Sequence, residues 1–348
     1  MAVEKPYSSN NVNLKAPSMT ALRRFLAVGM ALALLCPCRS SKTPRRPLYV
    51  FAAASLNTVL TEFEKSFERK RPDVDARVEV SGSLVAARKV SEYKRDGDIV
   101  IAADMRVIDS LLIPEFAEWQ VAFLSNEIVL AYSEKSRHAA ELTSANWPEI
   151  LVDPEVRVAR VDENLGPLGY QTLLVWKLAD IHYGTQRRGR SLFQTLSRKV
   201  SRRLIRPDAA ELLPVLGTEA DYIFLYRSMA RDHNLKHILL PPEVNLSSIA
   251  HRNVYSRASV AISAAPGRSL TIQGQPILFS LTILRNAPNH AGALSFVKML
   301  LGPEGKAILR RHGFAPVSPP RFHGRRESFP ESLRGVLRKP ATDRETIQ

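Results

Sequence analysis

Two consecutive strand–serine–helix units within residues 48–90 constrain the fold more strongly than any other stretch of the chain. Residues 48–51 are a short apolar run, which is typical of a buried strand, and Ser55 stands directly before a segment with apolar residues at helical spacing. The unit then repeats: residues 76–80 alternate like a half-buried strand, and Ser83 opens a second helix. The repetition predicts an α/β sheet in which two helices each begin at a serine.

A serine at a helix start has two physical uses. The first turn of a helix carries backbone N–H groups without intrahelical partners and the positive end of the helix dipole. The hydroxyl either caps its own helix, or it points with those N–H groups toward a bound anion. Ser55 and Ser83 can therefore be two ordinary N-caps or two sides of one oxyanion pocket. The residues alone leave both interpretations open.

A third strand–helix unit follows, in which a continuous apolar strand over residues 98–102 leads to a helix through residues 108–112. Three such units in succession predict an open, largely parallel α/β sheet. Residues 121–131 are a long apolar segment interrupted at Asn126 and Glu127. We interpret this segment as a strand that crosses into a second lobe.

The second lobe contains two more candidate helix starts. Pro167 suits the first position of a helix, and Gly166 before it lets the backbone approach a ligand closely. Asp208, with Glu211 three residues later, forms a capping-box pattern. Residues 221–226 form a strand, and we expect its end to face the same cleft as these two helix starts.

The end of the chain returns to the first lobe, with a strand over residues 277–284 and a helix over residues 291–301. Two segments that cross between lobes would form a hinge. The predicted architecture is a two-lobed α/β protein, in which each lobe is a mixed, mostly parallel sheet flanked by helices. Its predicted divisions are a leader and linker (1–46), the first lobe (47–125), the second lobe (126–264), the completion of the first lobe (265–318) and a disordered basic tail (319–348).

The net charge of +15 would suggest a nucleic-acid partner if it were spread over the body of the protein. However, residues 1–46 account for +7 of this charge and residues 319–348 for +3. Much of the remainder lies in residues 187–206, within which residues 194–205 form a basic amphipathic stretch. This stretch is either a solvated helix face or a patch for anionic lipid or nucleic acid. We predict no nucleic-acid partner.

Residues 1–42 resemble an export signal. A pair of arginines precedes an apolar run over residues 25–35, which is too short to span a bilayer. The region before the run is unusually long, so Met19 is an alternative start. Both cysteines of the chain, Cys36 and Cys38, follow the run, and either could carry a lipid anchor. We therefore predict an exported protein, periplasmic or anchored to the outer face of a membrane.

The chain lacks the sequence motifs of common catalytic and cofactor sites. G-x-S-x-G, a P-loop, G-x-G-x-x-G and H-E-x-x-H are all absent. His233 and His237 are four residues apart, but they fall in a predicted loop rather than on one helix face. With no cysteine beyond the leader, there is also no thiolate metal site. The sequence predicts a binding protein without a resident cofactor or metal, rather than an enzyme.

Several stretches, in one order, resemble the tungstate/molybdate-binding proteins of ABC importers. The most specific is Ser-Gly-Ser-Leu-Val-Ala-Ala-Arg-Lys-Val at residues 81–90, which looks like the second oxyanion loop of that family. The resemblance extends from about residue 48 to residue 317, and it is carried further by residues 98–104, 126–132, 135–136, 146–151, 166–170, 220–230, 240–243, 286–289 and 302–305.

The resemblance implies a type II periplasmic-binding-protein fold that closes on a tungstate or molybdate dianion and delivers it to an ABC permease with its ATPase subunit. The ligand-contacting positions of the family fall on Ser55, Ser83, Gly166 and Leu225, and we add Tyr226 at the end of the same strand. Members that hold the metal in six-coordinate fashion have carboxylates at the positions of Gly166 and Leu225. We therefore expect four-coordinate binding through hydroxyl and N–H groups.

Three other functions stay open. Another tetrahedral dianion, such as sulfate, would suit the same kind of pocket, and anion size is the property that would discriminate. A ligand-sensing regulator would need an N-terminal helix-turn-helix, which residues 1–46 are too short and too apolar to supply. An enzyme on the same scaffold is the third, because fold alone does not determine function.

Overall fold

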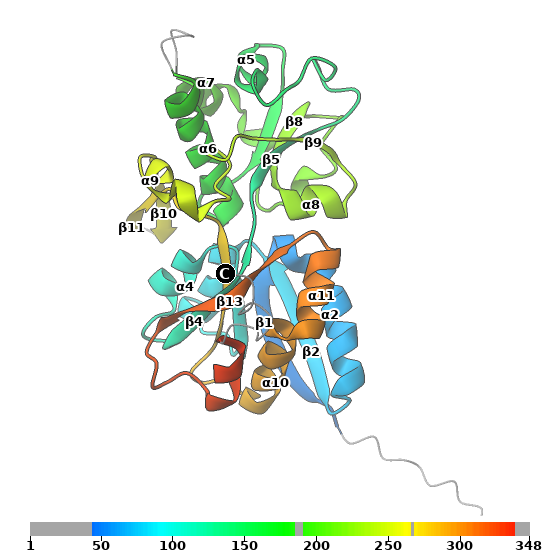
Figure 1. The fold of residues 1–348 in the computed structure, drawn as a ribbon, viewed down its shortest axis with the longest axis vertical. Helices are drawn as coiled ribbons and strands as arrows, with labels where there is room; N and C mark the ends of the chain where they lie inside the picture. The colour runs from blue at the N-terminus through cyan, green and yellow to red at the C-terminus, as the bar shows by residue number, and fades with distance from the viewer. Residues whose placement is uncertain (1–43, 185–190, 266–267, 338–348) are drawn as a thin grey trace, which may run out of the picture. The chain divides into compact units, whose positions relative to one another are not determined.

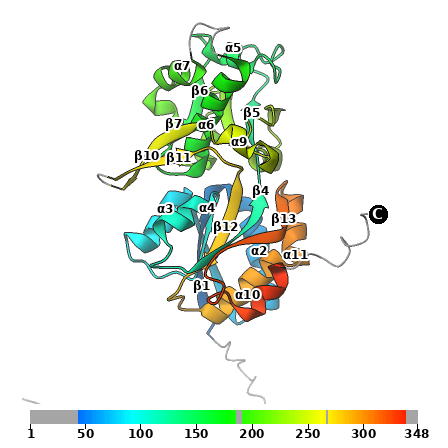
Figure 2. The ribbon, with the colours of Figure 1, turned by 60° about the vertical axis from the view of Figure 1, so that its left-hand side comes forward.

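The computed structural model describes residues 44–184, 191–265 and 268–337. The predicted leader, with Cys36 and Cys38, lies outside these residues. In the part of the chain that is described, no helix is both long enough and apolar enough to cross a bilayer. The described chain forms two β-sheets with helices on their faces, together with one separate hairpin (Figure 1 and Figure 2).

Lobe I is built on a six-stranded sheet in the order β13 (Ala315–Gly324), β4 (Trp119–Ser125), β12 (Leu278–Ile283), β3 (Ile99–Ala102), β1 (Arg46–Ala53) and β2 (Val74–Ser81). The strand–helix units predicted from the sequence supply its parallel part, in which β1 pairs with both β2 and β3. The pairs that add β12, β4 and β13 are antiparallel. The sheet is therefore mixed, as predicted, but it is not mostly parallel, because parallel pairing is confined to β1, β2 and β3.

Helices cover both faces of this sheet (Figure 1). One face carries α2 (Asn57–Lys70), α10 (His290–Leu301) and α11 (Pro303–Arg311), and the other carries α3 (Ser83–Ser91) and α4 (Met105–Leu111). Phe63 and Phe67 of α2 pack edge-on against Phe296 of α10, with ring centroids 4.8 and 5.2 Å apart. This buried contact joins a helix from the start of the chain to one from its end. The sequence predicted that both parts of the chain would contribute to lobe I.

Lobe II is built on a five-stranded sheet in the order β7 (Ile205–Arg206), β6 (Val158–Val161), β8 (Tyr222–Tyr226), β5 (Ile128–Tyr132) and β9 (Lys236–Leu239). Its helices are α5 (Trp147–Val152), α6 (Pro167–Tyr183), α7 (Leu192–Lys199), α8 (Arg227–Asp232) and α9 (Arg252–Tyr255). Most of α6 is buried, and Trp176 packs edge-on against Phe224 of β8 at 5.8 Å. This sheet is also mixed, because β6 is parallel to its neighbours and β5 is antiparallel to its own.

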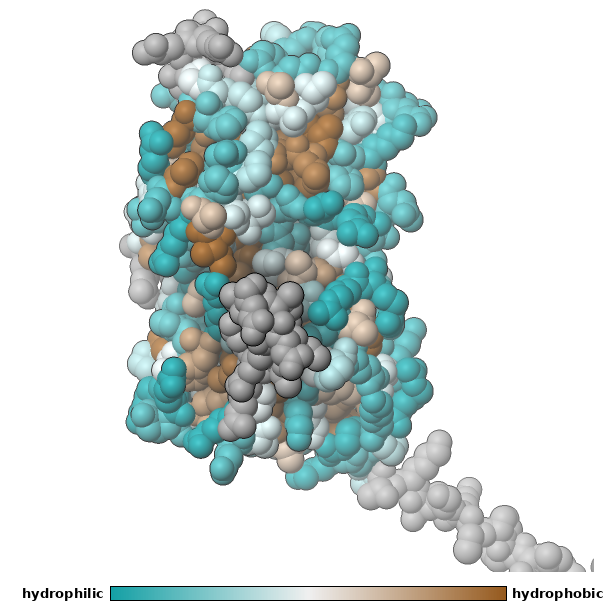
Figure 3. Space-filling view, in the orientation of Figure 1, coloured by the Kyte–Doolittle hydropathy of each residue, from teal (hydrophilic) through white to brown (hydrophobic). Residues whose placement is uncertain are grey.

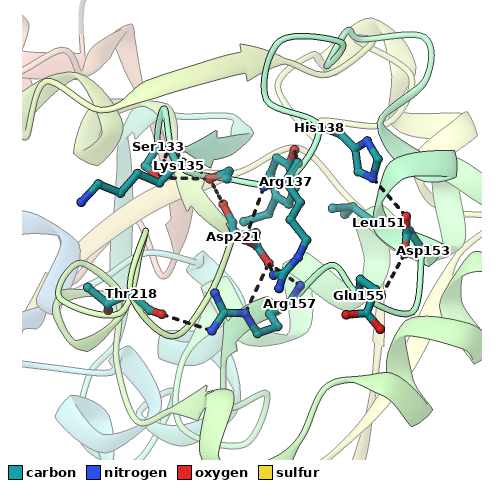
Figure 4. Close-up of polar contacts among 12 residues, drawn as sticks. Ser133, Lys135, Arg137, His138, Leu151, Asp153, Glu155, Arg157, Thr218 and Asp221 are labelled. Carbon is teal, nitrogen blue, oxygen red and sulfur yellow. Dashed lines mark hydrogen bonds and ion pairs between the residues drawn. The ribbon is translucent and has the colours of Figure 1, made fainter.

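A buried carboxylate organises the end of lobe II at which β8 begins (Figure 4). Asp221 accepts the backbone N–H of Arg157 at 2.7 Å and the guanidinium of Arg137 at 2.9 Å. Burial disfavours its charge, but hydrogen bonds from the two arginine backbones and the charges of their side chains outweigh burial and lower the pKa of Asp221. His138 and Asp153 pair beside it at 3.0 Å. These contacts fix loops within lobe II, at the opposite end of β8 from Tyr226.

The chain crosses between the lobes twice. The first crossing joins β4 directly to β5, as predicted. The second follows the hairpin of β10 (Ser259–Ala265) and β11 (Arg268–Gln273), which packs on α6, and it enters β12. On the way, Ile277 donates its N–H to the carbonyl of Leu246 at 2.9 Å. The predicted boundary between residues 264 and 265 falls inside the hairpin, so the return to lobe I comes later than predicted.

The chain is ordered from residue 319 to Leu337, which corrects the prediction of a disordered tail. β13 continues to Gly324 along β4, and a 3₁₀ helix covers Glu331–Leu337. Phe329 and Leu333 are buried, and the Phe329 ring meets the Trp119 ring of β4 edge-on at 5.0 Å. The ring of Trp119 gives these few apolar residues a surface to cover, which the polar composition of the tail does not reveal. Residues 338–348 lie outside the described residues.

Few large apolar side chains are strongly exposed on the described surface, namely those of Tyr93, Leu239 and Ile249. On the face drawn in Figure 3, hydrophilic residues predominate and hydrophobic residues form separate groups. Isolated apolar residues of this kind are normal on protein surfaces. The distinctive feature of the molecule is instead a small cavity between the lobes.

Candidate functional site

A small cavity lies between the two lobes, at a point where several helices begin. Its volume is about 20 Å³, which is room for a water-sized sphere and little more. Lobe I lines it with the 3₁₀ turn before α2 and the start of α3, and lobe II lines it with the start of α6 and the residues before a 3₁₀ helix (Ala210–Leu212). The lining residues are Ala53, Ala54, Ser55, Gly82, Ser83, Ala103, Val161, Gly166, Pro167, Leu168, Asp208, Ala209 and Tyr226.

The cavity lies at the carboxyl ends of the strands. On the lobe I side, its walls are the residues that directly follow β1, β2 and β3. On the lobe II side, they include Val161 and Tyr226, the last residues of β6 and β8. Ligands of open α/β sheets bind at this end of the strands.

The structure brings Ser55 and Ser83 to this cavity, and neither serine caps a helix. Ser55 lies within a 3₁₀ turn, Ala54–Leu56, rather than directly before α2 as predicted, and its buried Oγ has no hydrogen-bond partner in the described chain. Ser83 is the first residue of α3, and its Oγ accepts the N–H of Ala103 at 3.0 Å, which leaves the hydroxyl proton free to donate. The interpretation of the two serines as ordinary N-caps is therefore wrong.

Helix dipoles, rather than cationic side chains, set the electrostatics of the cavity. Pro167 is the first residue of α6, as predicted, with Gly166 as its N-cap, so this helix also begins at the cavity. None of the lining residues is Lys, Arg or His, and Asp208 is the one acid among them. The first-turn N–H groups of helices have no intrahelical acceptor and carry partial positive charge. These N–H groups can attract an anion without a full positive countercharge, and the carboxylate of Asp208 opposes that attraction.

Two glycines meet across the cleft beside the cavity. A Cβ on Gly82 would lie 2.3 Å from the carbonyl oxygen of Leu165 in lobe II, which is closer than van der Waals contact allows. A Cβ on Gly166 would lie 3.5 Å from the Cα of Gly82, an ordinary contact. Gly82 has φ −54° and ψ 137°, which any residue can adopt. Position 82 therefore requires glycine for the close approach of lobe II, not for its backbone conformation.

The structure brings Tyr226 to the cavity but not Leu225. Consecutive side chains of a strand point to opposite faces of the sheet, so only one of these two β8 residues can face the cavity. Leu225 is fully buried opposite Val129 of β5 and does not line the cavity. Tyr226 does line it, and its hydroxyl donates to Oε1 of Gln171 at 2.8 Å. Leu225 is thus removed from the candidate contact residues.

Asp208 is a lining residue that the sequence indicated only as a cap. Its Oδ1 accepts the N–H groups of Ala210 at 2.9 Å and Glu211 at 3.3 Å, but the helix that follows is only the 3₁₀ helix Ala210–Leu212, whose N-cap position is Ala209 rather than Asp208. Its place at the cavity follows from the parallel pairing of β7 with β6, which puts the strand before Asp208 beside Val161. No local sequence pattern carries that pairing, so sequence reasoning missed this role.

No group of three or more His, Cys, Asp or Glu side chains within the described ranges could hold a metal ion. His233 follows α8, whereas His237 lies in β9 with its Nδ1 2.9 Å from the carbonyl oxygen of Leu235. The two histidines thus belong to different elements, in keeping with the prediction that they are not a helical ligand pair.

Sequence comparison finds relatives that match most of the chain. The profile of the family described as bacterial extracellular solute-binding protein matches residues 48–315. A solute-binding protein of Petrotoga mobilis is 38% identical over 298 residues, which cover 85% of this chain and 91% of the relative. A molybdate/tungstate-binding protein of Pyrococcus abyssi is 33% identical over 318 residues, which cover 83% of this chain and 89% of the relative. These matches confirm the resemblance found in the sequence.

Solved structures confirm the fold. The periplasmic molybdate-binding protein of Azotobacter vinelandii superposes with a TM-score of 0.56 at 15% identity, covering 77% of this chain and 98% of its own. The sulfate-binding protein of Mycobacterium tuberculosis superposes with a TM-score of 0.57 at 13% identity, covering 79% of this chain and 88% of its own. At such identities the likeness concerns the fold alone, which is the two-lobed binding-protein fold predicted from the sequence.

Proposed function

Because the chain belongs to the family of bacterial extracellular solute-binding proteins, we propose that it is the receptor of an ABC importer for molybdate or tungstate. The name of the Pyrococcus abyssi relative supports this ligand class, and so does that of a Thermococcus kodakarensis relative, a molybdate/tungstate-binding protein 32% identical over 318 residues. The observation that carries the proposal for this chain is the meeting, at one cavity, of two serine hydroxyls that each have a proton to donate with the starts of α3 and α6.

In the proposed complex, a tetrahedral dianion accepts hydrogen bonds from Ser55, Ser83 and the first-turn N–H groups, with Gly166 and Tyr226 completing the wall. A hydrogen bond to a charged group contributes roughly 1.5–3 kcal/mol. About five to seven such bonds would contribute on the order of 8–21 kcal/mol, a range that includes the roughly 12 kcal/mol of nanomolar binding. The sum precedes the cost of association, so it establishes only that neutral donors suffice.

Four-coordinate binding is the proposed mode, because the one carboxylate at the cavity, that of Asp208, already accepts the N–H groups of Ala210 and Glu211. Neither Gly166 nor Leu225 has a carboxylate that could add a ligand to the metal of the anion, and Leu225 does not reach the cavity. Anion size then becomes the property by which the closed pocket selects. Sulfate, a smaller tetrahedral dianion, is the alternative ligand that this kind of site would have to exclude.

The proposed setting is the outer side of a membrane. Residues 1–42 would direct export, and Cys36 or Cys38 would carry a lipid anchor. The receptor would bind its anion there and pass it to the permease and ATPase subunits of the importer, with no catalytic step of its own.

Thermal unfolding tests the ligand assignment. The purified protein is melted without added anion and with molybdate, tungstate, sulfate or phosphate. Anion at about a hundred times its Kd should stabilise the protein by roughly 2.7 kcal/mol and raise Tm by several degrees. A rise with molybdate and tungstate only is the expected result. An equal rise with sulfate would reassign the receptor to that anion, and no rise with any of the four would refute oxyanion binding.

A further inference from the structure

A buried polar cluster connects the lobes behind the cavity, and it consists of Asp104, Tyr170, Gln171 and Tyr226. Asp104 belongs to lobe I, where it caps α4, and the other three belong to lobe II. The Asp104 carboxylate accepts the hydroxyl of Tyr170 at 3.0 Å and is 3.4 Å from the side-chain nitrogen of Gln171. Gln171 in turn accepts the hydroxyl of Tyr226 at 2.8 Å. A continuous chain of hydrogen bonds thus runs from lobe I to a wall of the cavity.

All four side chains are nearly inaccessible to water, with no more than 3% of each residue exposed. Arg106 balances the charge of the carboxylate at 2.5 Å. Burial disfavours the ionised form of Asp104, but the charge and hydrogen bonds of Arg106 outweigh burial and lower its pKa. Burial and the negative charge of Asp104 raise the pKa of Tyr170, so its hydroxyl remains a donor. The cluster therefore holds an ionised acceptor and protonated donors at neutral pH.

The bonds from Tyr170 and Gln171 to Asp104 exist only while the lobes are together. If lobe II moved away, Tyr170 and Gln171 would leave the carboxylate, whereas the contact between Asp104 and Arg106 within lobe I would remain. Gln171 would then no longer be held by Asp104, so it would fix the hydroxyl of Tyr226 less firmly. A hydrogen bond to a charged group is worth about twice a neutral one, and more where water is excluded.

We propose that the Asp104 cluster is a latch that forms on closure, slows the release of the bound anion and holds Tyr226 in place at the cavity. The proposal rests on the proposed receptor function in that the anion is taken to be molybdate or tungstate. Asp104 and Tyr170 do not line the cavity, so both are positioning residues.

Tyr170→Phe is the sharpest test, because it removes one hydroxyl and leaves the volume of a buried ring. Tyr222→Phe is the matched control, since Tyr222 is also buried in lobe II but donates its hydroxyl to the carbonyl of Arg137 in the same lobe. Stopped-flow tryptophan fluorescence gives the association and dissociation rates of tungstate for each protein. Circular dichroism gives the Tm of each protein without anion.

Tyr170→Phe should raise the tungstate dissociation rate about tenfold or more and leave the association rate within about twofold. Tyr222→Phe should leave both rates unchanged, although it lowers Tm. Asp104→Asn should also raise the dissociation rate, and the double variant with Tyr170→Phe should show less than the product of the single effects, because both remove one interaction. An unchanged dissociation rate in Tyr170→Phe, or a rise that Tyr222→Phe matches, would overturn the latch.

The latch can also be tested apart from the ligand. If the wild-type protein binds neither molybdate nor tungstate, the proposed function fails, and small-angle X-ray scattering without anion decides on the latch alone. A larger radius of gyration for Tyr170→Phe than for both wild type and Tyr222→Phe would support it. Equal radii for all three proteins would refute it.

Discussion

Gly82→Ala should weaken anion binding without destabilising lobe I. The added methyl group would meet the carbonyl oxygen of Leu165 at 2.3 Å and its carbon at 3.0 Å. Both atoms belong to the backbone of lobe II, so no side-chain rotation relieves the clash. Because φ and ψ of residue 82 suit alanine, the open form of the protein should accept the substitution.

The size of the effect follows from the cost of overpacking. An extra methyl group in a well-packed region costs typically 1–3 kcal/mol. If this cost falls on the closed form alone, it reduces affinity by a factor of about 5 to 150, since each 1.4 kcal/mol corresponds to tenfold. The loss should appear in the dissociation rate, because the anion first meets the open form.

Isothermal titration calorimetry with tungstate measures the affinity, and thermal unfolding without anion measures the stability. Gly305→Ala is the matched control, since its Cβ would lie 2.2 Å from the carbonyl oxygen of Leu300, a backbone clash of the same kind within lobe I. Gly305→Ala should lower Tm and leave the affinity of the folded protein unchanged. Gly82→Ala should lower the affinity and leave the anion-free Tm unchanged. The reasoning is refuted if Gly82→Ala binds tungstate as tightly as wild type, or if both variants lower Tm equally.

Three further predictions concern single side chains. Ser55→Ala should weaken tungstate binding about 10- to 150-fold in calorimetry. It should leave the anion-free Tm unchanged, because the hydroxyl that it removes makes no hydrogen bond in the described chain. Unchanged affinity would exclude Ser55 from the site. Asp208→Asn keeps an oxygen for the N–H of Ala210 and removes the negative charge, so it should tighten binding several-fold, while weaker binding would mean that the carboxylate itself contacts the anion. Burial opposes the charge of His312, but its hydrogen bonds to Glu62 and Asp232 outweigh burial and raise its pKa. This stabilisation is complete at pH values below the pKa of histidine in the unfolded chain, about 6.5, and it is lost as pH rises through the higher pKa of His312 in the folded protein. Over this pH range, Tm should fall in wild type and fall less in His312→Gln. Parallel curves of Tm against pH for the two proteins would contradict this.

The strand–helix units of lobe I could be predicted because their signals are local. The apolar run of β3 and the helical spacing in α2 each lie within one short window of sequence. The start of α2 could not be placed, because a 3₁₀ turn and an α-helix share the same pattern over three residues. Ser55 was therefore predicted directly before the helix, whereas it lies in the 3₁₀ turn. The serine nevertheless lies at the predicted end of β1.

Features that depend on distant pairing were missed. Asp208 reaches the cavity because β7 pairs with β6, and the tail is ordered because β13 pairs with β4. In both cases the partner strand lies far away in the sequence, so the local segment does not reveal the pairing. The resemblance also pointed to Leu225, but strand alternation places only Tyr226 at the cavity.

The contacts around the cavity suggest how a site made of neutral donors can still select by size. An anion too large for the space between the two walls would force the lobes to separate slightly. Such separation loosens two contacts that span the lobes, the one between Gly82 and Leu165 and the one between Asp104 and Tyr170. A larger anion gains from reaching donors on both walls but loses part of these contacts, whereas a smaller anion keeps the contacts and leaves donors unsatisfied. Selectivity would then depend on the spacing that lobe-to-lobe contacts set, and residues outside the cavity could change anion preference as strongly as the serines that line it.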